Sequence, residues 1–396
     1  MTKLKNLEKA AERIRQAVQN KERIIIYGDS DMDGISSTVI LQEAIKTLGG
    51  EVFDTMFPDR ENDGYGVNKK ALELLKGKAP QTGDPAKRGL GASRALFITL
   101  DLGIGNIKEV EVLNEMGFEV IIVDHHEILE RIPNAKIVID PKQEGDDSEL
   151  TYLANVGVTL KLCEELLGDN FSENLKNSFL ELVALATISD MVPQIGDNKI
   201  FIEKGLRSLG STFRPALRAF VDIFGEGEVA VGGSSRIISS LNAAESKDFK
   251  NESYELLINS DPQECKDGAE KLIAKVQHKQ MKIKQAAEEV ERRISQKSAE
   301  AVIFEGDPAW KLTLAGPIAS IIAGKYQKPT FIYKKGDTES CGSVRSLNEG
   351  ENSVDAMKTC ADFLITYGGH AKASGFRLKN EDLEKFKDCL NKYFKK

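Results

Sequence analysis

Residues 120–126 have the sequence VIIVDHH, in which an apolar run ends abruptly in a carboxylate and two imidazoles. A short run of apolar, mostly β-branched residues predicts a buried strand, and two of the chain's 4 histidines stand side by side here. The runs at 24–27 and 95–100 end in the same manner, the first in GDSDMDG at 28–34 and the second in Asp101. Three strands that deliver metal-binding side chains at their carboxyl ends predict one metal-binding crevice.

Short apolar strands alternate with helical patterns over the first 200 residues. The expected strands are 23–28, 52–57, 95–100, 118–123 and 136–139, and the expected helices are 36–48, 67–76, 106–116, 152–167 and 174–188. Such alternation is typical of an α/β fold, with a mostly parallel sheet flanked by helices. Ligands of these sheets bind outside the carboxyl ends of the strands, where the polar motifs fall.

The chain is expected to have three parts: residues 1–200 with the metal site, residues 201–298 as a helical connector, and residues 299–396 as a smaller α/β domain. The connector would include a long charged helix at 261–297, and residues 200–260 look mainly helical with a Gly-rich interruption at 225–233. The last domain has expected strands near 301–304, 312–314 and 329–333. Residues 80–94, rich in Gly, Pro and Lys, are typical of a surface loop.

The composition is that of an ordinary globular protein, with 41% hydrophobic and 29% charged residues. No apolar run is long enough to span a bilayer, and the first 20 residues are patterned as an amphipathic helix and not as a signal peptide. We therefore expect a cytoplasmic protein with no membrane partner, in which the 5 scattered cysteines are reduced. The net charge of −8 disfavours nonspecific duplex binding, although divalent cations in a cleft would permit a strand to bind there.

The polar side chains that follow these elements are a metal-ligand set of five carboxylates and one imidazole: Asp29, Asp31, Asp33, Asp101, His125 and Asp190. Oxygen-rich donors of this kind suit Mn²⁺ or Mg²⁺ better than a thiolate-held metal. The set is too large for one catalytic ion and suits two that share a carboxylate. Ions roughly 3.5–4 Å apart clamp the attacking and leaving oxygens of a phosphoryl displacement, so phosphoester hydrolysis is the expected reaction.

Each piece of this pattern has a simpler interpretation when it is taken alone. The GDSDMDG run could be a calcium loop, but an EF-hand needs a Glu where this chain has Ile40. Asp101 could cap the helix that follows it, and Asp190 could be an ordinary helix-end residue. The order and placement of all the pieces together favour the metal site.

In four segments the chain resembles the DHH phosphoesterase superfamily, and within it the RecJ-like single-strand exonucleases. The segments are GDSDMDG at 28–34, TLDLGI at 99–104, VDHH at 123–126 and ATISDMVP at 186–193. The first has the Asp-first form typical of RecJ, whereas many smaller relatives begin with His. The elements PDR at 58–60 and GYG at 64–66 also resemble a RecJ segment, which makes Arg60 and Tyr65 candidate substrate contacts.

The resemblance implies two Mn²⁺ ions, with Mg²⁺ as the alternative. Asp29, Asp31 and Asp101 would hold one ion, and Asp33, Asp101, His125 and Asp190 would hold the other, with Asp101 bridging. Asp124 would orient His125, and His126 would meet the scissile phosphate or assist the leaving oxygen.

The segment YGGHAKASGF at 367–376 resembles the glycine-rich motif of the DHH-associated C-terminal domain. Gly368 and Gly369 would let backbone amides approach an anion, and His370 would supply charge. Ser343 and Arg345 would add a hydroxyl and a bidentate phosphate donor. A Gly-Gly-His run by itself is more simply a tight turn. Lysines 271, 275, 279 and 282 form a basic stripe that is either a solvated face or part of a substrate cleft.

Two departures from bacterial RecJ stand out. Its Asn-Ala-Ala-Gly-Arg element is replaced by SLNAAES at 240–246. Asn242 is kept as a candidate substrate contact, and Arg236 is a second candidate that would compensate for the missing arginine. The chain ends at Lys396 and leaves no room for an oligonucleotide-binding barrel, so a compact archaeal-type member is expected.

We expect a Mn²⁺-dependent exonuclease for single-stranded DNA or RNA, degrading DNA from the 5′ end by resemblance, in repair or replication. The closest alternative is a phosphodiesterase for short oligoribonucleotides or cyclic dinucleotides. A scaffold at the replication fork is a third interpretation, and replication proteins of the GINS type are expected partners for an archaeal-type member. Digestion polarity and the choice between DNA and RNA stay open.

Overall fold

The computed structural model describes residues 3–395 except 61, 63, 80–94, 129–130, 226–232, 297–299 and 348–351. The expected loop at 80–94 and most of the Gly-rich stretch at 225–233 lie outside the described residues. The chain forms two compact units, Met1–Lys275 and Val276–Lys396.

The first unit is built on a five-stranded sheet in the order β2-β1-β3-β4-β5, and every pairing is parallel. Its strands are β1 (Arg23–Gly28), β2 (Asp54–Met56), β3 (Ala95–Leu100), β4 (Phe118–Val123) and β5 (Ile137–Ile139). The mostly parallel α/β sheet expected from the sequence is therefore confirmed. Because the strands are parallel, all their carboxyl ends lie at one edge of the sheet.

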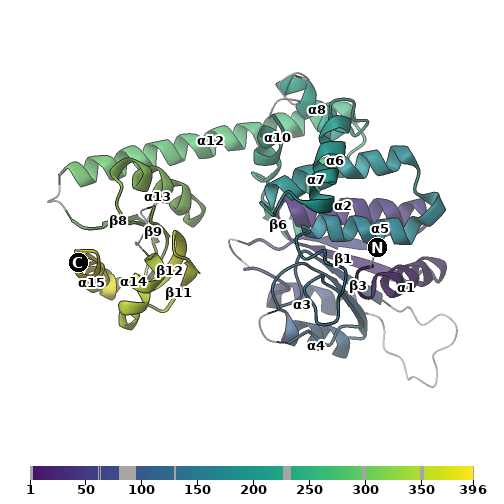
Figure 1. Cartoon of the computed structure of the whole chain (residues 1–396), viewed down its shortest axis with the longest axis horizontal. Helices are drawn as coiled ribbons and strands as arrows, with labels where there is room; N and C mark the ends of the chain where they lie inside the picture. Colours follow the sequence, from purple (N-terminus) through teal and green to yellow (C-terminus); the bar gives the residue numbers. More distant parts are fainter. Residues whose placement is uncertain are drawn as a thin grey trace. The chain divides into compact units, whose positions relative to one another are not determined.

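Helices cover both faces of this sheet, which explains why its strands are apolar throughout. The helices and short strands of the first unit are α1 (Leu7–Gln19), α2 (Met32–Thr47), α3 (Lys69–Lys76), α4 (Ile107–Glu115), α5 (Asn155–Leu167), η2 (Gly168–Asn170), α6 (Glu173–Ser189), α7 (Gly196–Leu209), α8 (Pro215–Phe224), α10 (Ser234–Leu241), β6 (Ser246–Lys247), β7 (Lys250–Asn251) and α11 (Glu252–Ile258). Figure 1 shows α2 and α5 on one side of the strands and α3 and α4 on the other.

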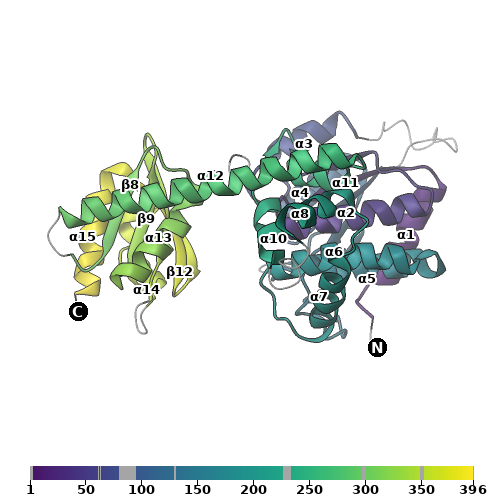
Figure 2. The same cartoon turned by 90° about the horizontal axis from the view of Figure 1, so that it is seen from above.

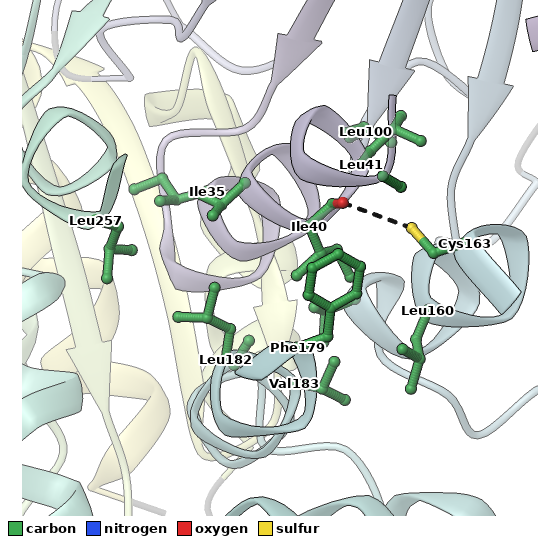
Figure 3. Close-up of a cluster of buried hydrophobic side chains, with 14 of the residues drawn as sticks. Ile35, Ile40, Leu41, Leu100, Leu160, Cys163, Phe179, Leu182, Val183 and Leu257 are labelled. Carbon is green, nitrogen blue, oxygen red and sulfur yellow. Dashed lines mark hydrogen bonds between the residues drawn. The ribbon is translucent and has the colours of Figure 1, made fainter. Parts of the chain in front are cut away.

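Successive residues of β1 belong to two different hydrophobic cores. Ile24 and Ile26 pack with α2, α5 and α6, whereas Ile25 and Tyr27 pack with α3 and α4. Figure 3 shows the larger core, where side chains of α2, α5 and α6 meet and the Cys163 thiol donates to the Ile40 carbonyl at 3.7 Å. The strands are thus buried on both faces, and their parallel pairing places the strand ends at one edge.

The larger core also includes residues that follow residue 200 in the sequence. Phe201, Leu217, Leu256 and Leu272 belong to the same cluster as the residues around the sheet. Residues through Lys275 consequently form one compact unit with the sheet. The division into 1–200, 201–298 and 299–396 stays a prediction.

Helix α2 begins at Met32, earlier than the Ser36 start expected from the sequence. The Asp31 side chain caps it by accepting hydrogen bonds from the backbone N–H groups of Asp33 and Gly34, each at 3.1 Å. An aspartate is a favoured N-cap because its oxygen satisfies N–H groups that lack partners in the first turn. Asp33 therefore lies in the first turn of a helix, not in an open turn.

Helix α12 (Pro262–Ser295) is one continuous helix that begins in the first unit and ends in the second (Figure 2). It confirms the long charged helix expected at 261–297. Among the helices of the described residues, this one included, none has both the length and the apolar character needed to cross a membrane.

The second unit is a mixed five-stranded sheet in the order β11-β12-β10-β9-β8, in which only the pairing of β8 with β9 is parallel. Its elements are β8 (Ile303–Asp307), α13 (Leu312–Tyr326), β9 (Thr330–Lys335), β10 (Glu339–Arg345), α14 (Ser353–Thr359), η4 (Ala361–Phe363), β11 (Thr366–His370), β12 (Ala373–Lys379), η5 (Asn380–Asp382) and α15 (Leu383–Phe394). The smaller C-terminal α/β unit is thus as expected.

The strand expected at 312–314 is wrong, because these residues begin helix α13. Leu314, Ile318 and Ile322 are all buried and recur at helical spacing. They pack with Ala286 and Val290 of α12. A short apolar run does not distinguish a strand from a buried helix until its full length is considered.

The expectation of five reduced cysteines is also wrong. Cys360 and Cys389 form a disulfide across 29 residues, with Cα atoms 6.0 Å apart. Both belong to the apolar core between α14, α15 and the sheet, which brings them together. Cys163, Cys265 and Cys341 are free.

Replacing Cys389 by Ser should destabilise the second unit of the oxidised chain. Closing a loop of 29 residues restricts the unfolded chain by about 3–4 kcal/mol. The chain's 1 tryptophan, Trp310, lies in this unit, so its fluorescence in a denaturant titration reports the change. Reductant should bring the parent chain to the level of the variant, and Cys341→Ser should change little. Equal midpoints for the parent chain and Cys389→Ser without reductant would contradict the expectation.

Candidate metal centre

Four predicted ligands from four different elements meet at the carboxyl edge of the first sheet. His125 Nε2 lies 3.4 Å from Asp101 Oδ1, 3.7 Å from Asp190 Oδ2 and 3.9 Å from Asp33 Oδ2. Asp101 follows β3, His125 follows β4, Asp33 lies at the start of α2, and Asp190 lies at the end of α6. The fold therefore brings together residues that are far apart in the sequence.

A second group of ligand atoms adjoins the first. One oxygen each from Asp29, Asp31 and Asp101 lies within 4.8 Å of the others, and the same is true of ligand atoms from Asp33, His125 and Asp190. Because Asp101 also lies close to His125, it stands between the two groups. The structure thus brings all six predicted ligands together, and it also places a ligand atom of His126 within 4.8 Å of ligand atoms of Asp101 and His125.

Two atoms at the centre of this cluster are buried without a hydrogen-bond partner among the described residues. These atoms are His125 Nε2 and Asp190 Oδ2. Burying a polar atom without a partner is costly, so such atoms in a folded protein call for an explanation. A divalent cation bound between them would satisfy both, and the carboxylate-rich donor set fits Mn²⁺ or Mg²⁺.

The His125 ring is held by a backbone carbonyl. Its Nδ1 lies 3.0 Å from the Leu153 carbonyl oxygen, to which it donates, and this leaves Nε2 with a free lone pair. Burial lowers the pKa of His125 to about 4, so the ring is neutral near pH 7, as a metal ligand must be. The expectation that Asp124 orients this ring is wrong.

Asp124 instead holds the neighbouring ring. Its Oδ1 accepts from His126 Nδ1 at 2.7 Å and from the His125 backbone N–H at 2.8 Å, while Oδ2 accepts from the Ile104 backbone N–H at 2.9 Å. Burial opposes ionisation of Asp124, but the hydrogen bond and charge of His126, together with the backbone N–H groups of Ile104 and His125, outweigh burial and lower the pKa of Asp124. Burial likewise opposes protonation of His126, yet the contact with Asp124 raises the pKa of His126 above its ordinary value.

Like charges are crowded at this centre. Burial, together with the nearby Asp190 and Asp31 carboxylates, raises the pKa of Asp33, even though its oxygens accept from the backbone N–H groups of Asn155 and Val156 at 2.8 and 2.7 Å. Burial and the surrounding carboxylates also raise the pKa of Asp101. Ionised carboxylates at this density need a compensating cation.

Arg60 and Tyr65, the predicted substrate contacts of this unit, lie at the rim of the centre. Arg60 Nε donates to Asp29 Oδ1 at 2.6 Å, and Arg60 Nη2 donates to Asp31 Oδ2 at 2.8 Å. The Tyr65 hydroxyl donates to the Asp101 carbonyl at 3.0 Å, and the Tyr65 ring lies edge-on to His126. The side chains of both residues remain partly open to solvent.

Asn242 joins two ligand-bearing helices, which the sequence alone did not indicate. Its Oδ1 accepts from the Met32 backbone N–H at 3.1 Å, and its Nδ2 donates to Ser189 Oγ at 2.8 Å, next to Asp190. The Arg236 guanidinium lies 4.1 Å from the centre of the Phe224 ring.

The predicted substrate residues of the second unit share one sheet. Ser343 of β10 pairs with Gly375 of β12, which pairs with Gly368 of β11. In the same way Arg345 and His370 flank Ala373. Gly369 has φ +124° and leaves no room for a Cβ atom, which would lie 2.7 Å from the Ala373 carbonyl oxygen. The motif is therefore a β-hairpin beside Ser343 and Arg345.

The basic stripe on α12 is partly neutralised. Lys271 and Lys275 form ion pairs with Glu252, at 3.0 and 2.5 Å. For these two residues the solvated-face interpretation holds.

Sequence reasoning missed Asp140, although the signal was present, because Asp140 follows the apolar run of β5 as Asp101 follows β3. It is fully buried, and its Oδ2 has no hydrogen-bond partner among the described residues. Burial raises the pKa of Asp140 to about 7, although the Lys142 backbone N–H donates to its Oδ1 at 2.8 Å. Asn155 and Leu153 were also missed, since nothing in their spacing indicates their partners.

Asp140→Asn should remove a pH-dependent loss of stability. The unfolded carboxyl ionises near pH 4, whereas the folded one stays protonated up to about pH 7. Stability of the parent chain should therefore fall relative to the Asn variant as pH rises between these values, by at most about 1.4 kcal/mol per pH unit. Urea titrations of both metal-free chains between pH 4 and 8 measure this difference. Parallel stability curves would contradict it.

Two family models match the chain. The N-terminal domain of the DHH family matches residues 23–187, and the DHHA1 domain matches residues 299–396. The first match contains most of the acidic centre, and the second contains the glycine-rich hairpin.

Relatives resemble the chain along nearly its whole length. The single-stranded-DNA-specific exonuclease RecJ of Bacillus subtilis is 30% identical over 397 residues, which are 98% of this chain and 48% of that protein. The protein of the same name from Thermus thermophilus is 30% identical over 393 residues, 98% of this chain and 54% of that protein. The chain thus spans about half the length of these two relatives.

Solved structures agree with the fold. A crystal structure of exonuclease RecJ bound to manganese has a TM-score of 0.78 at 27% identity and covers 100% of this chain and 95% of its own. RecJ of Thermus thermophilus in complex with Mn²⁺ has a TM-score of 0.75 at 26% identity and covers 99% of this chain and 55% of its own. With both domains matched in order, the chain belongs to the DHH superfamily and is a RecJ-like member of it.

Proposed function

We propose that the chain is an exonuclease that hydrolyses phosphodiester bonds of single-stranded DNA with a pair of Mn²⁺ ions, which Mg²⁺ could replace. One observation carries the proposal: Asp33, Asp101 and Asp190 converge on the buried, unpartnered Nε2 of a neutral His125. The names of the relatives, single-stranded-DNA-specific exonucleases, support the substrate class.

The residues fit two ions. Asp29, Asp31 and Asp101 would hold one ion, and Asp33, Asp101, His125 and Asp190 would hold the other. When bound, such a pair neutralises phosphate charge and lowers the pKa of water, which supplies a nucleophile near neutral pH.

His126 is the residue suited to proton transfer. Its Nδ1 is tied to Asp124 at 2.7 Å, and its side chain is 46% exposed, so Nε2 is free to meet a phosphate oxygen or the leaving oxygen. Because Asp124 raises the pKa of His126, the ring can carry and donate a proton near neutral pH. Asp124 thereby positions and charges His126.

Arg60 and Tyr65, at the rim of the metal centre, are suited to bind the phosphates and the bases of a single strand. A guanidinium binds phosphate oxygens in pairs, and an exposed aromatic ring stacks on bases of any sequence. In the second unit, Ser343, Arg345 and His370 would bind a further phosphate, and Gly368, where a Cβ atom would meet nothing within 4 Å, leaves space beside the backbone. Asn242 would act indirectly by holding the start of α2 and the end of α6, and Arg236 would contact the strand only if it leaves Phe224.

Asp101→Asn and His125→Ala should each lower nuclease activity by at least about 100-fold, because each removes a ligand at the junction of the two groups. Release of nucleotides from a labelled single strand in Mn²⁺ measures the activity. Asp169→Asn is the matched control, since Asp169 is an exposed carboxylate of the same unit outside the centre. Full activity of either ligand variant would refute the assignment.

Substrate length and polarity should distinguish the proposal from its closest alternative. Single-stranded DNA oligomers labelled at the 5′ or the 3′ end should be shortened progressively from the 5′ end, and faster than a dinucleotide is cleaved. The rate at which an RNA oligomer of the same sequence is digested shows whether the chain prefers DNA or RNA. Faster cleavage of the dinucleotide would favour the oligoribonucleotide or cyclic-dinucleotide phosphodiesterase, and no cleavage of any substrate would favour a scaffold. Association with GINS-type replication proteins and a cytoplasmic location stay predictions.

A further inference from the structure

We infer that Asn155 is a positioning residue that sets the geometry of the metal ligands without contacting an ion itself. The inference rests on the proposed metal centre. Asn155 is the first residue of α5, is fully buried, and has no place in the motifs that point to the function. Its contacts reach the elements that carry Asp33, Asp101 and His125.

The backbone of Asn155 holds one ligand. Its N–H donates to Asp33 Oδ2 at 2.8 Å, and the next N–H, that of Val156, donates to Asp33 Oδ1 at 2.7 Å. Both groups belong to the first turn of α5, where N–H groups lack partners within the helix and favour a negative charge. The start of α5 therefore fixes the direction in which the Asp33 carboxylate points.

The side-chain amide holds the second ligand. The amide is oriented so that its nitrogen and its oxygen both have hydrogen-bond partners. Its Nδ2 donates to the Val123 carbonyl at 3.0 Å, and its Oδ1 accepts from the Asp101 N–H at 2.9 Å and from Ser37 Oγ at 3.1 Å. Asp101 has φ 65°, a left-handed conformation that residues other than glycine rarely adopt without support. The Asn155 amide contributes to that support, because the Asp101 N–H is shared between Asn155 Oδ1 and the Val123 carbonyl, the latter at 3.1 Å.

The third ligand depends on the same short segment. Val123, whose carbonyl accepts from Asn155, directly precedes Asp124 and His125. The Leu153 carbonyl, two residues before Asn155, accepts from His125 Nδ1. Residues 153–156 thus contact ligand-bearing segments that follow β3 and β4 and begin α2. Removing the amide would free Asp101 and Val123 to shift relative to Asp33.

Asn155→Ala should raise the dissociation constant of Mn²⁺ by about 10- to 100-fold, the usual effect of losing a group that orients metal ligands. Calorimetric titration of the metal-free full-length chain with Mn²⁺ alone measures this without any nuclease assay. Asn251→Ala is the matched control, because Asn251 is equally buried and its side chain also makes three hydrogen bonds, to Ser246, Ser253 and Tyr254. Thermal unfolding in chelator should show similar destabilisation in both variants, while only Asn155→Ala loses Mn²⁺ affinity.

Unchanged Mn²⁺ affinity in a folded Asn155→Ala chain would overturn the inference, as would an equal loss in Asn251→Ala. If Asn155→Ala does not fold, Ser37→Ala serves in its place, since it removes only the hydroxyl that donates to the amide. A loss of about 5-fold in affinity is then expected, and no loss would overturn the inference. Failure of the parent chain to bind Mn²⁺ is a different result, which would refute the metal centre itself.

Discussion

Repulsion among buried carboxylates is the constraint on which the rest of this structure depends. Asp33 and Asp101 lie in a water-poor centre beside other carboxylates, and burial with these neighbours raises the pKa of both. The fold must hold these groups together against their mutual repulsion, and the tightly packed helices on both faces of the sheet do so. The same crowding that would destabilise the centre alone makes it a strong site for divalent cations.

The adjacent histidines His125 and His126 have opposite pKa shifts because their surroundings differ. His125 is buried and bonded to a neutral carbonyl, and burial lowers its pKa to about 4. His126 is half exposed and bonded to the ionised Asp124, which raises the pKa of His126. The first is therefore suited to donate a lone pair to a metal, and the second is suited to carry a proton. The two imidazoles are suited to different roles because one is buried and the other is partly exposed to solvent.

The second unit contributes a different kind of chemistry. Its glycine-rich hairpin, with Ser343 and Arg345 on the neighbouring strand, is the arrangement proposed to bind phosphate, and its described residues contain no cluster of acidic ligands. Gly369 is required there because a side chain would collide with the opposite strand. The Cys360–Cys389 disulfide ties α15 to the core behind this sheet. Metal binding and the proposed phosphate binding are thus built on separate hydrophobic cores.

By itself the sequence predicted the strands of the first sheet, their mostly parallel pairing, and the candidate metal ligands at their ends. Strong apolar runs and their polar terminators are local signals, and parallel pairing places all carboxyl ends at one edge. The disulfide, the partner of Asp124 and the contacts of Asn155 were decided only by tertiary structure. Each depends on contacts between segments distant in the chain, such as Asn155 with Asp101 and Val123. Residue spacing does not indicate such contacts, because they depend on how the elements pack against one another.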